Sequence, residues 1–244
     1  MKHIKTKGFE IAVYKQGNKN SKKLMLCLPG RLDTKDYPHM KSHVEYFAKK
    51  GYLALSFDPP GTWESPGSIA LYTMTNYLKV IDELITYFGN RPTVLFGHSR
   101  GGTVAMIAGT QNNAVTHIIA IMSHMTSSKA GKGKMQGGVE ISLRDTPPND
   151  STHKKTFHLP LEYFEDARKY NPLEALRTCT KPKLFVRGTK DTRVTPEEIF
   201  EAFKSSANPK VYKEVHSEHG YRRNSKAIGE INEIVDNFLR SESI

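Results

Sequence analysis

The sequence predicts an α/β fold with a mostly parallel, doubly wound sheet and an inserted cap. Short apolar runs alternate along the chain with longer segments whose apolar residues recur at helical spacing, which is typical of a parallel sheet covered by helices on both faces. One interval, residues 125–180, breaks this alternation. We therefore expect residues 1–124 and 181–244 to form the core of the fold and residues 125–180 to form a cap or lid insertion.

The expected strands are short runs that are either wholly apolar or alternate between apolar and polar residues. They are residues 9–15, 24–28, 52–57, 93–96, 117–122, 183–186 and 211–215. The expected helices have apolar residues three or four positions apart. They are residues 39–50, 69–88, 102–108, 196–205 and 226–239. Gly51 and Gly89 are expected to end the first two helices, and Thr195 with Glu198 has the spacing of a capping box at the start of the fourth.

The interval from 125 to 180 is too long to be a structureless loop inside a compact domain. Residues 127–138 are rich in Gly, Ser and Lys and are expected to be mobile, whereas residues 146–150 resemble a turn-rich linker. Residues 161–170 have helical periodicity. A small cap is the expected outcome, although the interval could also merely decorate the surface.

The charge balance does not by itself identify a partner. The chain of 244 residues has 36 basic and 25 acidic side chains, a formal net charge of +11. Such a charge attracts nucleic acids, but the basic residues are dispersed and no zinc-finger, RNA-binding or recognition-helix pattern accompanies them. We expect no specific nucleic-acid partner, and a basic surface would equally favour anionic substrates or lipids.

The cysteine content and the hydropathy bear on location. Cys27 and Cys179 are the only cysteines, and two cysteines do not make a disulfide framework. A reducing, cytoplasmic location is therefore expected. No apolar stretch approaches the ~20 residues of a membrane-spanning helix. No apolar run follows the basic N-terminal residues, so no export signal is expected. The sequence leaves the oligomeric state open.

The most informative motif is Gly97-x-Ser99-x-Gly101, which lies between an expected strand and an expected helix. This is the context of a nucleophile elbow, in which a strained turn projects a serine above a sheet. Glycines on either side remove side chains that would clash in such a turn. The N-terminus of the following helix would stabilise negative charge that develops at the serine. The alternative is a structural turn with an incidental serine.

From this motif outward, the chain resembles the α/β-hydrolase fold superfamily, in particular its serine esterases and lipases with a small cap insertion. The resemblance covers nearly the whole chain outside the cap. It rests on the elbow and on Pro29-Gly30-Arg31, the stretch of residues 58–65 (DPPGTWES), Gly188-Thr189-Lys190-Asp191 and His219-Gly220, which occur in the family's order.

The resemblance implies a nucleophile at Ser99, an acid at Asp191 and a base at His219, in the family's Ser, acid, His order. The histidine would take the serine proton and return it to the leaving group, and the aspartate would orient the histidine. Asp191 could instead be an ordinary turn aspartate, and His216 is the alternative base. His98 is expected to be structural, because its side chain should point away from that of Ser99.

The backbone N–H groups of Arg31 and Arg100 are the expected oxyanion hole. The chain departs from the family at two nearby positions. Pro29 stands where the family often has histidine, so the loop must be fixed by other groups. Trp63 stands at a family glycine, where its side chain would narrow the cleft.

Candidate substrate contacts are Leu32, Trp63, His124, Tyr163 and Phe164. No metal site is expected: His39 and His43 have i, i+4 spacing, but the glutamate of a zinc-protease motif is missing. Phosphate-loop and dinucleotide patterns are also missing, and the implied chemistry requires no cofactor.

These observations predict a serine hydrolase that cleaves an ester or related acyl bond of a small molecule through an acyl-enzyme. Peptidase, thioesterase, lactonase and haloperoxidase-like activities would use the same residues. A catalytically inactive binding protein on the same fold is the alternative from another class.

Overall fold

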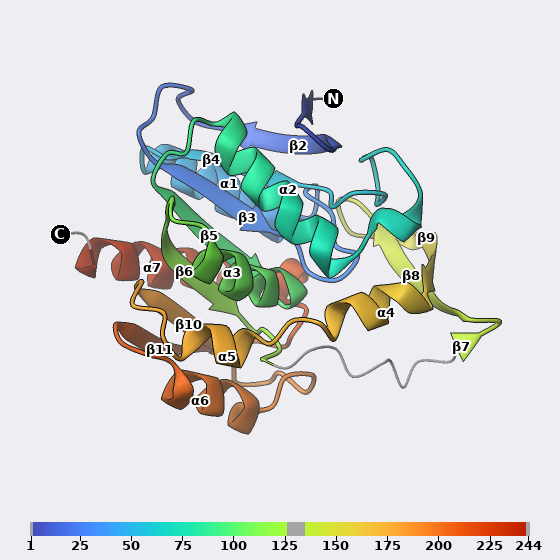
Figure 1. Ribbon diagram of the computed structural model, residues 1–244. Coiled ribbons are helices and arrows are strands. Elements are labelled where there is room, and N and C mark those ends of the chain that lie inside the picture. The colour runs from blue at the N-terminus through green and yellow to red at the C-terminus, as the bar shows by residue number, and fades with distance from the viewer. Residues whose placement is uncertain (1, 126–134, 243–244) are drawn as a thin grey trace.

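The computed structural model describes residues 2–125 and 135–242, and the expected mobile segment 127–138 lies largely outside these ranges. An eight-stranded sheet has the order β1-β2-β4-β3-β5-β6-β10-β11 (Figure 1). β2 pairs antiparallel with both of its neighbours, β1 and β4, and all the other neighbouring strands pair parallel. The strands are β1 Lys2–Lys5, β2 Glu10–Gln16, β3 Leu24–Leu28, β4 Leu53–Phe57, β5 Thr93–His98, β6 Val115–Ile121, β10 Lys183–Gly188 and β11 Lys210–Val215. The expectation of a mostly parallel α/β sheet is confirmed.

Helices cover both faces of this sheet. Those associated with it are α1 Pro38–Lys49, η1 Ile69–Leu71, α2 Met74–Tyr87, α3 Arg100–Gln111, α5 Pro172–Leu176, α6 Pro196–Ser205, η2 Tyr221–Arg223 and α7 Ser225–Ser241. The apolar residues form two clusters, one beneath α1 and α7 and one beneath α2, α3 and α6. Alternate residues of β3 enter opposite clusters, Leu26 one and Cys27 the other, as the two-residue period of a strand requires.

The expected single helix over residues 69–88 is wrong, because the chain breaks between η1 and α2. Tyr72 has a ψ of 75°, which is not helical, and the Thr73 side chain accepts a hydrogen bond from the backbone N–H of Asn76. An N-cap of this kind starts a new helix. The helical periodicity extends across the break and therefore concealed it.

Residues 135–180, called the insert from here on, contain a second, three-stranded antiparallel sheet. Its elements are β7 Met135–Gln136, β8 Val139–Thr146, β9 Asp150–Pro160 and α4 Leu161–Ala167, followed by α5. The expected linker at 146–150 is therefore a hairpin turn, and the strands on either side of it were not foreseen. The helix expected over 161–170 ends earlier, at Ala167.

The insert's strands and α4 lie at one end of the main sheet, at the right of Figure 1, whereas α5 lies below α3. The α4 side chain of Asp166 binds it to α2, because it accepts hydrogen bonds from the Thr75 backbone N–H at 2.8 Å and hydroxyl at 2.6 Å. The hydroxyl of Tyr37 donates to the carbonyl of Asp145 in β8 at 2.7 Å. None of the helices in the described ranges combines the length and the apolar character needed to cross a membrane.

Candidate active site

Five neighbouring parallel strands carry the candidate residues in the turns at their carboxyl ends. Arg31 follows β3, Ser99 follows β5, His124 follows β6, Asp191 follows β10 and His219 follows β11. Ligand sites in open α/β sheets form at this edge, because the loops after neighbouring parallel strands meet there. The sheet therefore brings together residues that are far apart in the sequence.

Ser99 occupies a strained turn between β5 and α3. Its φ of 52° and ψ of −121° lie outside the regions that a residue with a side chain prefers. A Cβ at Gly97 would lie 2.1 Å from the carbonyl oxygen of Gly101, and one at Gly101 would lie 2.0 Å from that of Leu28. Only glycine fits at these two positions, so the motif fulfils the steric role expected from the sequence.

Ser99, His219 and Asp191 form a chain of hydrogen bonds. Ser99 Oγ lies 2.9 Å from His219 Nε2, and His219 Nδ1 lies 2.8 Å from Asp191 Oδ2. A carboxylate accepts and does not donate, so Nδ1 carries the proton and Nε2 is free to accept from the serine hydroxyl. All three residues are at least nine-tenths buried.

Electrostatics favour a neutral histidine and an ionised aspartate. Burial lowers the pKa of His219 below its ordinary value, against the opposing effect of the Asp191 hydrogen bond, and the charge of Arg193 lowers it further. Burial tends to raise the pKa of Asp191, but the His219 hydrogen bond and the backbone N–H groups of Arg193 and Val194 bring it below its ordinary value. The histidine is therefore an available base near neutral pH.

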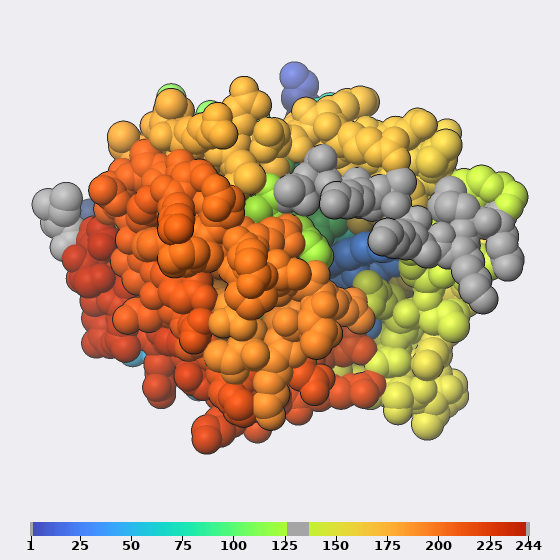
Figure 2. All heavy atoms as spheres, turned by 90° about the horizontal axis from the view of Figure 1, so that it is seen from below, coloured from blue at the N-terminus to red at the C-terminus, as the bar shows by residue number. Residues whose placement is uncertain are grey.

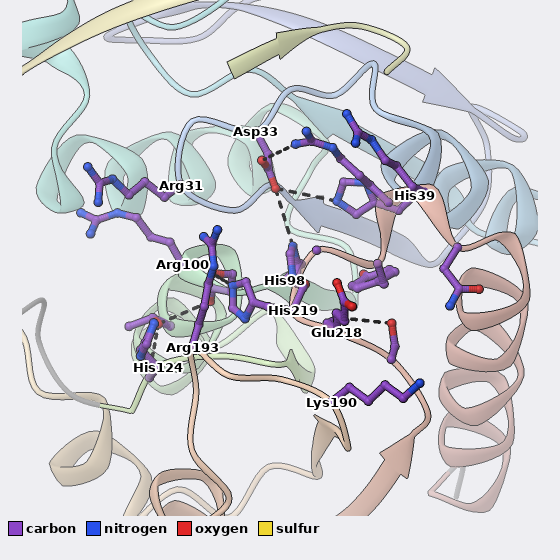
Figure 3. Close-up of a pocket in the computed structure, with 18 of the residues that line it drawn as sticks. Arg31, Asp33, His39, His98, Arg100, His124, Lys190, Arg193, Glu218 and His219 are labelled. Atoms are coloured by element: carbon purple, nitrogen blue, oxygen red, sulfur yellow. Dashed lines mark hydrogen bonds and ion pairs between the residues drawn. The ribbon is translucent and has the colours of Figure 1, made fainter. Parts of the chain in front are cut away.

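The competing histidines have other partners. His216 Nδ1 lies 3.1 Å from the hydroxyl of Thr189, and no contact joins His216 to Ser99. His98 Nε2 donates to the backbone carbonyl of His219 at 2.9 Å. Behind His98 lies Asp33, whose Oδ2 is 3.6 Å from His98 Nδ1 and 3.9 Å from His39 Nε2 (Figure 3). No motif in the sequence pointed to this buried group.

Asp33, His39 and His98 are also donor types that bind metal ions, and their ligand atoms lie within 4.8 Å of one another. The surrounding charge is unfavourable for a cation, because Arg222 Nη1 lies 3.9 Å from Asp33 Oδ1. The ring of His43, the other member of the i, i+4 pair, packs edge-on against His39, but its two nitrogens hydrogen-bond to Asn232 and Tyr221 and not to this cluster. A second acidic cluster, Asp36, Asp58 and Glu64, surrounds the ammonium group of Lys35.

Two tyrosines and a tryptophan fix the loop after β3, where the family histidine is replaced by Pro29. Tyr77 donates to the carbonyl of Pro29 at 3.0 Å, and Tyr72 accepts from the backbone N–H of Leu32 at 3.1 Å. Trp63 Nε1 donates to the carbonyl of Leu32 at 3.0 Å. The backbone N–H groups of Arg31 and Arg100, the expected oxyanion donors, have no acceptor in the described part of the chain.

A cavity of about 880 Å³ adjoins Ser99 and His219. Figure 2 shows the surface hollowed between the orange C-terminal loops and the yellow-green strands of the insert, with blue and green core residues at the bottom. Of the expected substrate contacts, His124 and Tyr163 line this cavity. Leu32 and Phe164 are buried in the apolar core.

Trp63 does not line the cavity either. Its ring packs edge-on against Phe157 of β9, with ring centroids 5.3 Å apart, and so helps to seat the insert on the core. Its φ of 47° is the left-handed conformation that favours glycine, which accounts for the glycine that the family has here.

Comparison with known proteins agrees with this architecture. A family model described as the alpha/beta hydrolase fold matches residues 23–140, whereas no curated protein matches the chain. The ferulic-acid-bound esterase Est1E from Butyrivibrio proteoclasticus is similar over 99% of both chains, with 20% identity and a TM-score of 0.77. Mouse alpha/beta hydrolase domain-containing protein 10 is similar over 99% of both chains, with 16% identity and a TM-score of 0.77. A monoacylglycerol lipase from Paleococcus ferrophilus has 18% identity and a TM-score of 0.75 over 96% of this chain and 99% of its own.

Proposed function

On the premise that this chain has the α/β-hydrolase fold, we propose that it is a serine hydrolase that cleaves an ester or related acyl bond of a small molecule. The observation that carries the proposal is the chain of hydrogen bonds from Ser99 through His219 to Asp191. A serine hydroxyl is a weak nucleophile until a neighbouring base accepts its proton. His219, neutral and within hydrogen-bond distance, is placed to be that base.

The reaction would proceed in two halves. Ser99 Oγ attacks the substrate carbonyl while His219 Nε2 takes the hydroxyl proton, and Asp191 stabilises the resulting imidazolium. The backbone N–H groups of Arg31 and Arg100 donate to the oxyanion, and removing one such donor typically costs about 10²–10³ in rate. The imidazolium protonates the leaving alcohol, and water then hydrolyses the acyl-enzyme by the same route.

The insert would act as the cap of this site. It contributes Tyr163 to the cavity lining, and its strands border the opening in Figure 2. Pocket walls set the substrate range in such a site, since the reacting groups are shared by many acyl transfers. Peptidase, thioesterase and lactonase activities on the same residues therefore remain the alternatives to esterase activity.

Labelling with a fluorophosphonate probe tests the proposal directly. The reagent should attach to the wild-type protein at Ser99, identified by peptide mass spectrometry, and the Ser99→Ala variant should remain unlabelled. The variant should fold, because the hydroxyl makes no packing contact beyond His219. A wild-type protein that resists the probe and hydrolyses no 4-nitrophenyl ester would instead support an inactive binding protein.

A further inference from the structure

His219, the candidate base, is held at two points by consecutive residues at the end of β5. Its side chain contacts the candidate nucleophile, since His219 Nε2 lies 2.9 Å from Ser99 Oγ. Its backbone carbonyl accepts a hydrogen bond from Nε2 of His98, the residue directly before Ser99, also at 2.9 Å. The distance between Ser99 and His219 therefore depends on His98, because a shift of the His219 backbone would move the imidazole away from the hydroxyl.

A carboxylate faces the other ring nitrogen of His98. Asp33 Oδ2, in the loop after β3, lies 3.6 Å from His98 Nδ1 (Figure 3). A backbone carbonyl can only accept, so His98 Nε2 carries a proton and Nδ1 is the atom that the carboxylate faces. Burial tends to raise the pKa of Asp33, but the imidazole of His98 and the charge of Arg144 bring that pKa below its ordinary value. The ionised carboxylate and the donated N–H together orient the His98 ring.

Two further rings restrict His98. Tyr221 and His39 lie edge-on to it, with ring centroids 4.8 Å and 5.5 Å away. His98 is only 4% exposed, so its ring has no room to turn toward solvent. His39 Nε2 also faces Asp33, at 3.9 Å, but burial lowers the pKa of His39 well below its ordinary value, so this second ring is neutral. The packing therefore keeps His98 in position to donate to His219.

Asp33 also connects this arrangement to the loop that carries an expected oxyanion donor. Its backbone N–H donates to the carbonyl of Gly30 at 3.1 Å. A Cβ at Gly30 would lie 2.8 Å from Asp33 Oδ2 and 3.4 Å from His98 Nδ1, so the backbone of Gly30 packs directly on the two side chains. The next residue is Arg31, whose backbone N–H is the expected donor. Asp33 and His98 therefore lie between the loop after β3 and the loop that carries His219.

Arg222 is another cation near Asp33. Its Nη1 lies 3.9 Å from Asp33 Oδ1, but its Nη2 lies 2.5 Å from Asp145 Oδ2 in the insert. The shorter ion pair joins η2 to β8, so the charge of Arg222 is balanced without Asp33. A partnership with Arg222 therefore does not account for the position of Asp33 Oδ2 against the His98 ring.

We propose that Asp33 and His98 form a second carboxylate–histidine pair that positions the candidate base: His98 fixes the backbone of His219, and Asp33 orients His98. This role rests on the proposed function, because the position of a base matters to a reaction only if Ser99 reacts. Both are positioning residues, since they act through His219 and not on the substrate. A misplacement of about 1 Å between reacting groups can cost about 10²-fold in rate, so the loss of this pair should lower kcat and leave KM nearly unchanged.

Two substitutions of His98 separate positioning from packing. His98→Leu removes the N–H donor, and kcat on 4-nitrophenyl butyrate should fall by about tenfold or more with KM within about twofold of the wild type. His98→Gln keeps an N–H donor of similar reach and should restore most of the kcat. His117→Leu is the matched control, because His117 is a half-buried histidine of the neighbouring strand β6 whose ring packs against Phe238 outside the cavity. Its kcat and KM should equal those of the wild type.

Proton NMR tests the positioning without a substrate. His219 Nδ1 lies 2.8 Å from Asp191 Oδ2, and the proton between them should give a downfield resonance. The resonance should be present in the wild type and in His98→Gln, and it should be lost in His98→Leu because the displaced imidazole no longer meets the carboxylate. If the wild-type protein hydrolyses no ester but this loss is seen, the proposed function fails and the positioning of His219 by His98 stands.

A double-mutant cycle tests whether Asp33 acts through His98. Asp33→Asn removes the charge and should lower kcat by a smaller factor than His98→Leu does. In the His98→Leu protein, Asp33→Asn should have no further effect, because the ring that it orients is gone. Additive losses in kcat, or no loss from Asp33→Asn in either background, would overturn the pair.

Thermal melting verifies that each variant folds. If His98→Leu does not fold, His98→Asn replaces it, because the shorter amide cannot reach the carbonyl of His219, and the same losses are expected. A folded variant without the donor that keeps both the wild-type kcat and the downfield resonance would overturn the positioning role. Equal losses of kcat in folded His98→Leu and His98→Gln would overturn it as well, since the donated hydrogen bond would then not matter.

Discussion

The carboxyl edge of the main sheet and the insert border the same cavity but are built differently. At the sheet edge, each residue of the proposed triad stands in a short turn after a strand and is held by hydrogen bonds to its neighbours, as Ser99 is by His219. In the insert, a hairpin leaves Ile141 46% and Leu143 58% exposed. Polar contacts such as that of Asp166 with Thr75 join it to the core.

Under the proposed function, this difference would separate the chemistry of the reaction from the selection of the substrate. The sheet edge fixes atoms by steric constraint and short hydrogen bonds, so even small changes there should affect any substrate. The insert supplies surface that can change without disturbing those atoms. Four substitutions test this division, and they are given from the largest expected effect to the smallest.

The largest effect is expected from Asp191→Asn at the sheet edge. The amide cannot accept the Nδ1 proton in the same way, so the histidine adopts the wrong tautomer, and kcat should fall by about 10⁴. Initial rates on a 4-nitrophenyl ester measure the change. The matched control is Asp82→Asn on the surface of α2, which should retain wild-type rates.

His216→Ala refines the same test, because it removes the alternative base. A rate loss below about tenfold is expected, since His216 contacts Thr189 and not Ser99. A loss as severe as that of Asp191→Asn would reassign the base to His216.

A smaller and selective effect is expected in the insert. Tyr163→Leu changes a cavity wall, whereas Phe164→Leu changes a neighbouring side chain packed in the core. Tyr163→Leu should shift the ratio of kcat/KM for long and short acyl esters by about tenfold, equal to about 1.4 kcal/mol. Phe164→Leu should leave this ratio unchanged.

Both variants remove buried contacts and should lower stability by about 0.5–3 kcal/mol, so thermal melting is measured alongside activity. Equal ratios in two folded variants would mean that the insert does not select the substrate.

The smallest effect concerns the pH profile. Protonated His219 cannot accept the serine proton, so kcat/KM should rise with pH and level off once the histidine is neutral. Its pKa is lowered, so the midpoint should lie below 6.5. Arg193→Gln removes a positive charge that disfavours the imidazolium, so the midpoint should move upward by a few tenths of a pH unit at low salt.

The charge-matched Arg177→Gln variant should not move this midpoint. High salt should shrink the shift, because Arg193 is exposed. A downward shift in Arg193→Gln would show that the sign of this interaction is wrong.

Much of the site could be predicted because its residues stand in locally encoded turns. Gly97, Ser99 and Gly101 are close in sequence, and the steric demand of the turn falls on those positions. The insert was harder: β9 begins with a polar run, and the apolar residues that alternate along β8 include Ile141 and Leu143, which are exposed and not part of a core. The break before α2 depended on the cap at Thr73, which the helical periodicity concealed.

The sequence by itself determined the alternation of buried strands and helices, the elbow at Ser99 and the order of the three hydrogen-bonded residues, because burial and turn geometry are encoded by neighbouring residues. Only the tertiary structure decided which polar and charged groups obtain a hydrogen-bond or ion-pair partner from a distant part of the chain. Tyr72 and Tyr77 hydrogen-bond to the loop after β3, which Pro29 cannot hold by a side-chain hydrogen bond. Arg31 forms an ion pair with Glu140, whereas Arg100 pairs with no carboxylate in the described chain. A side chain's charge is visible in the sequence, but whether that charge is balanced depends on groups brought close by folding.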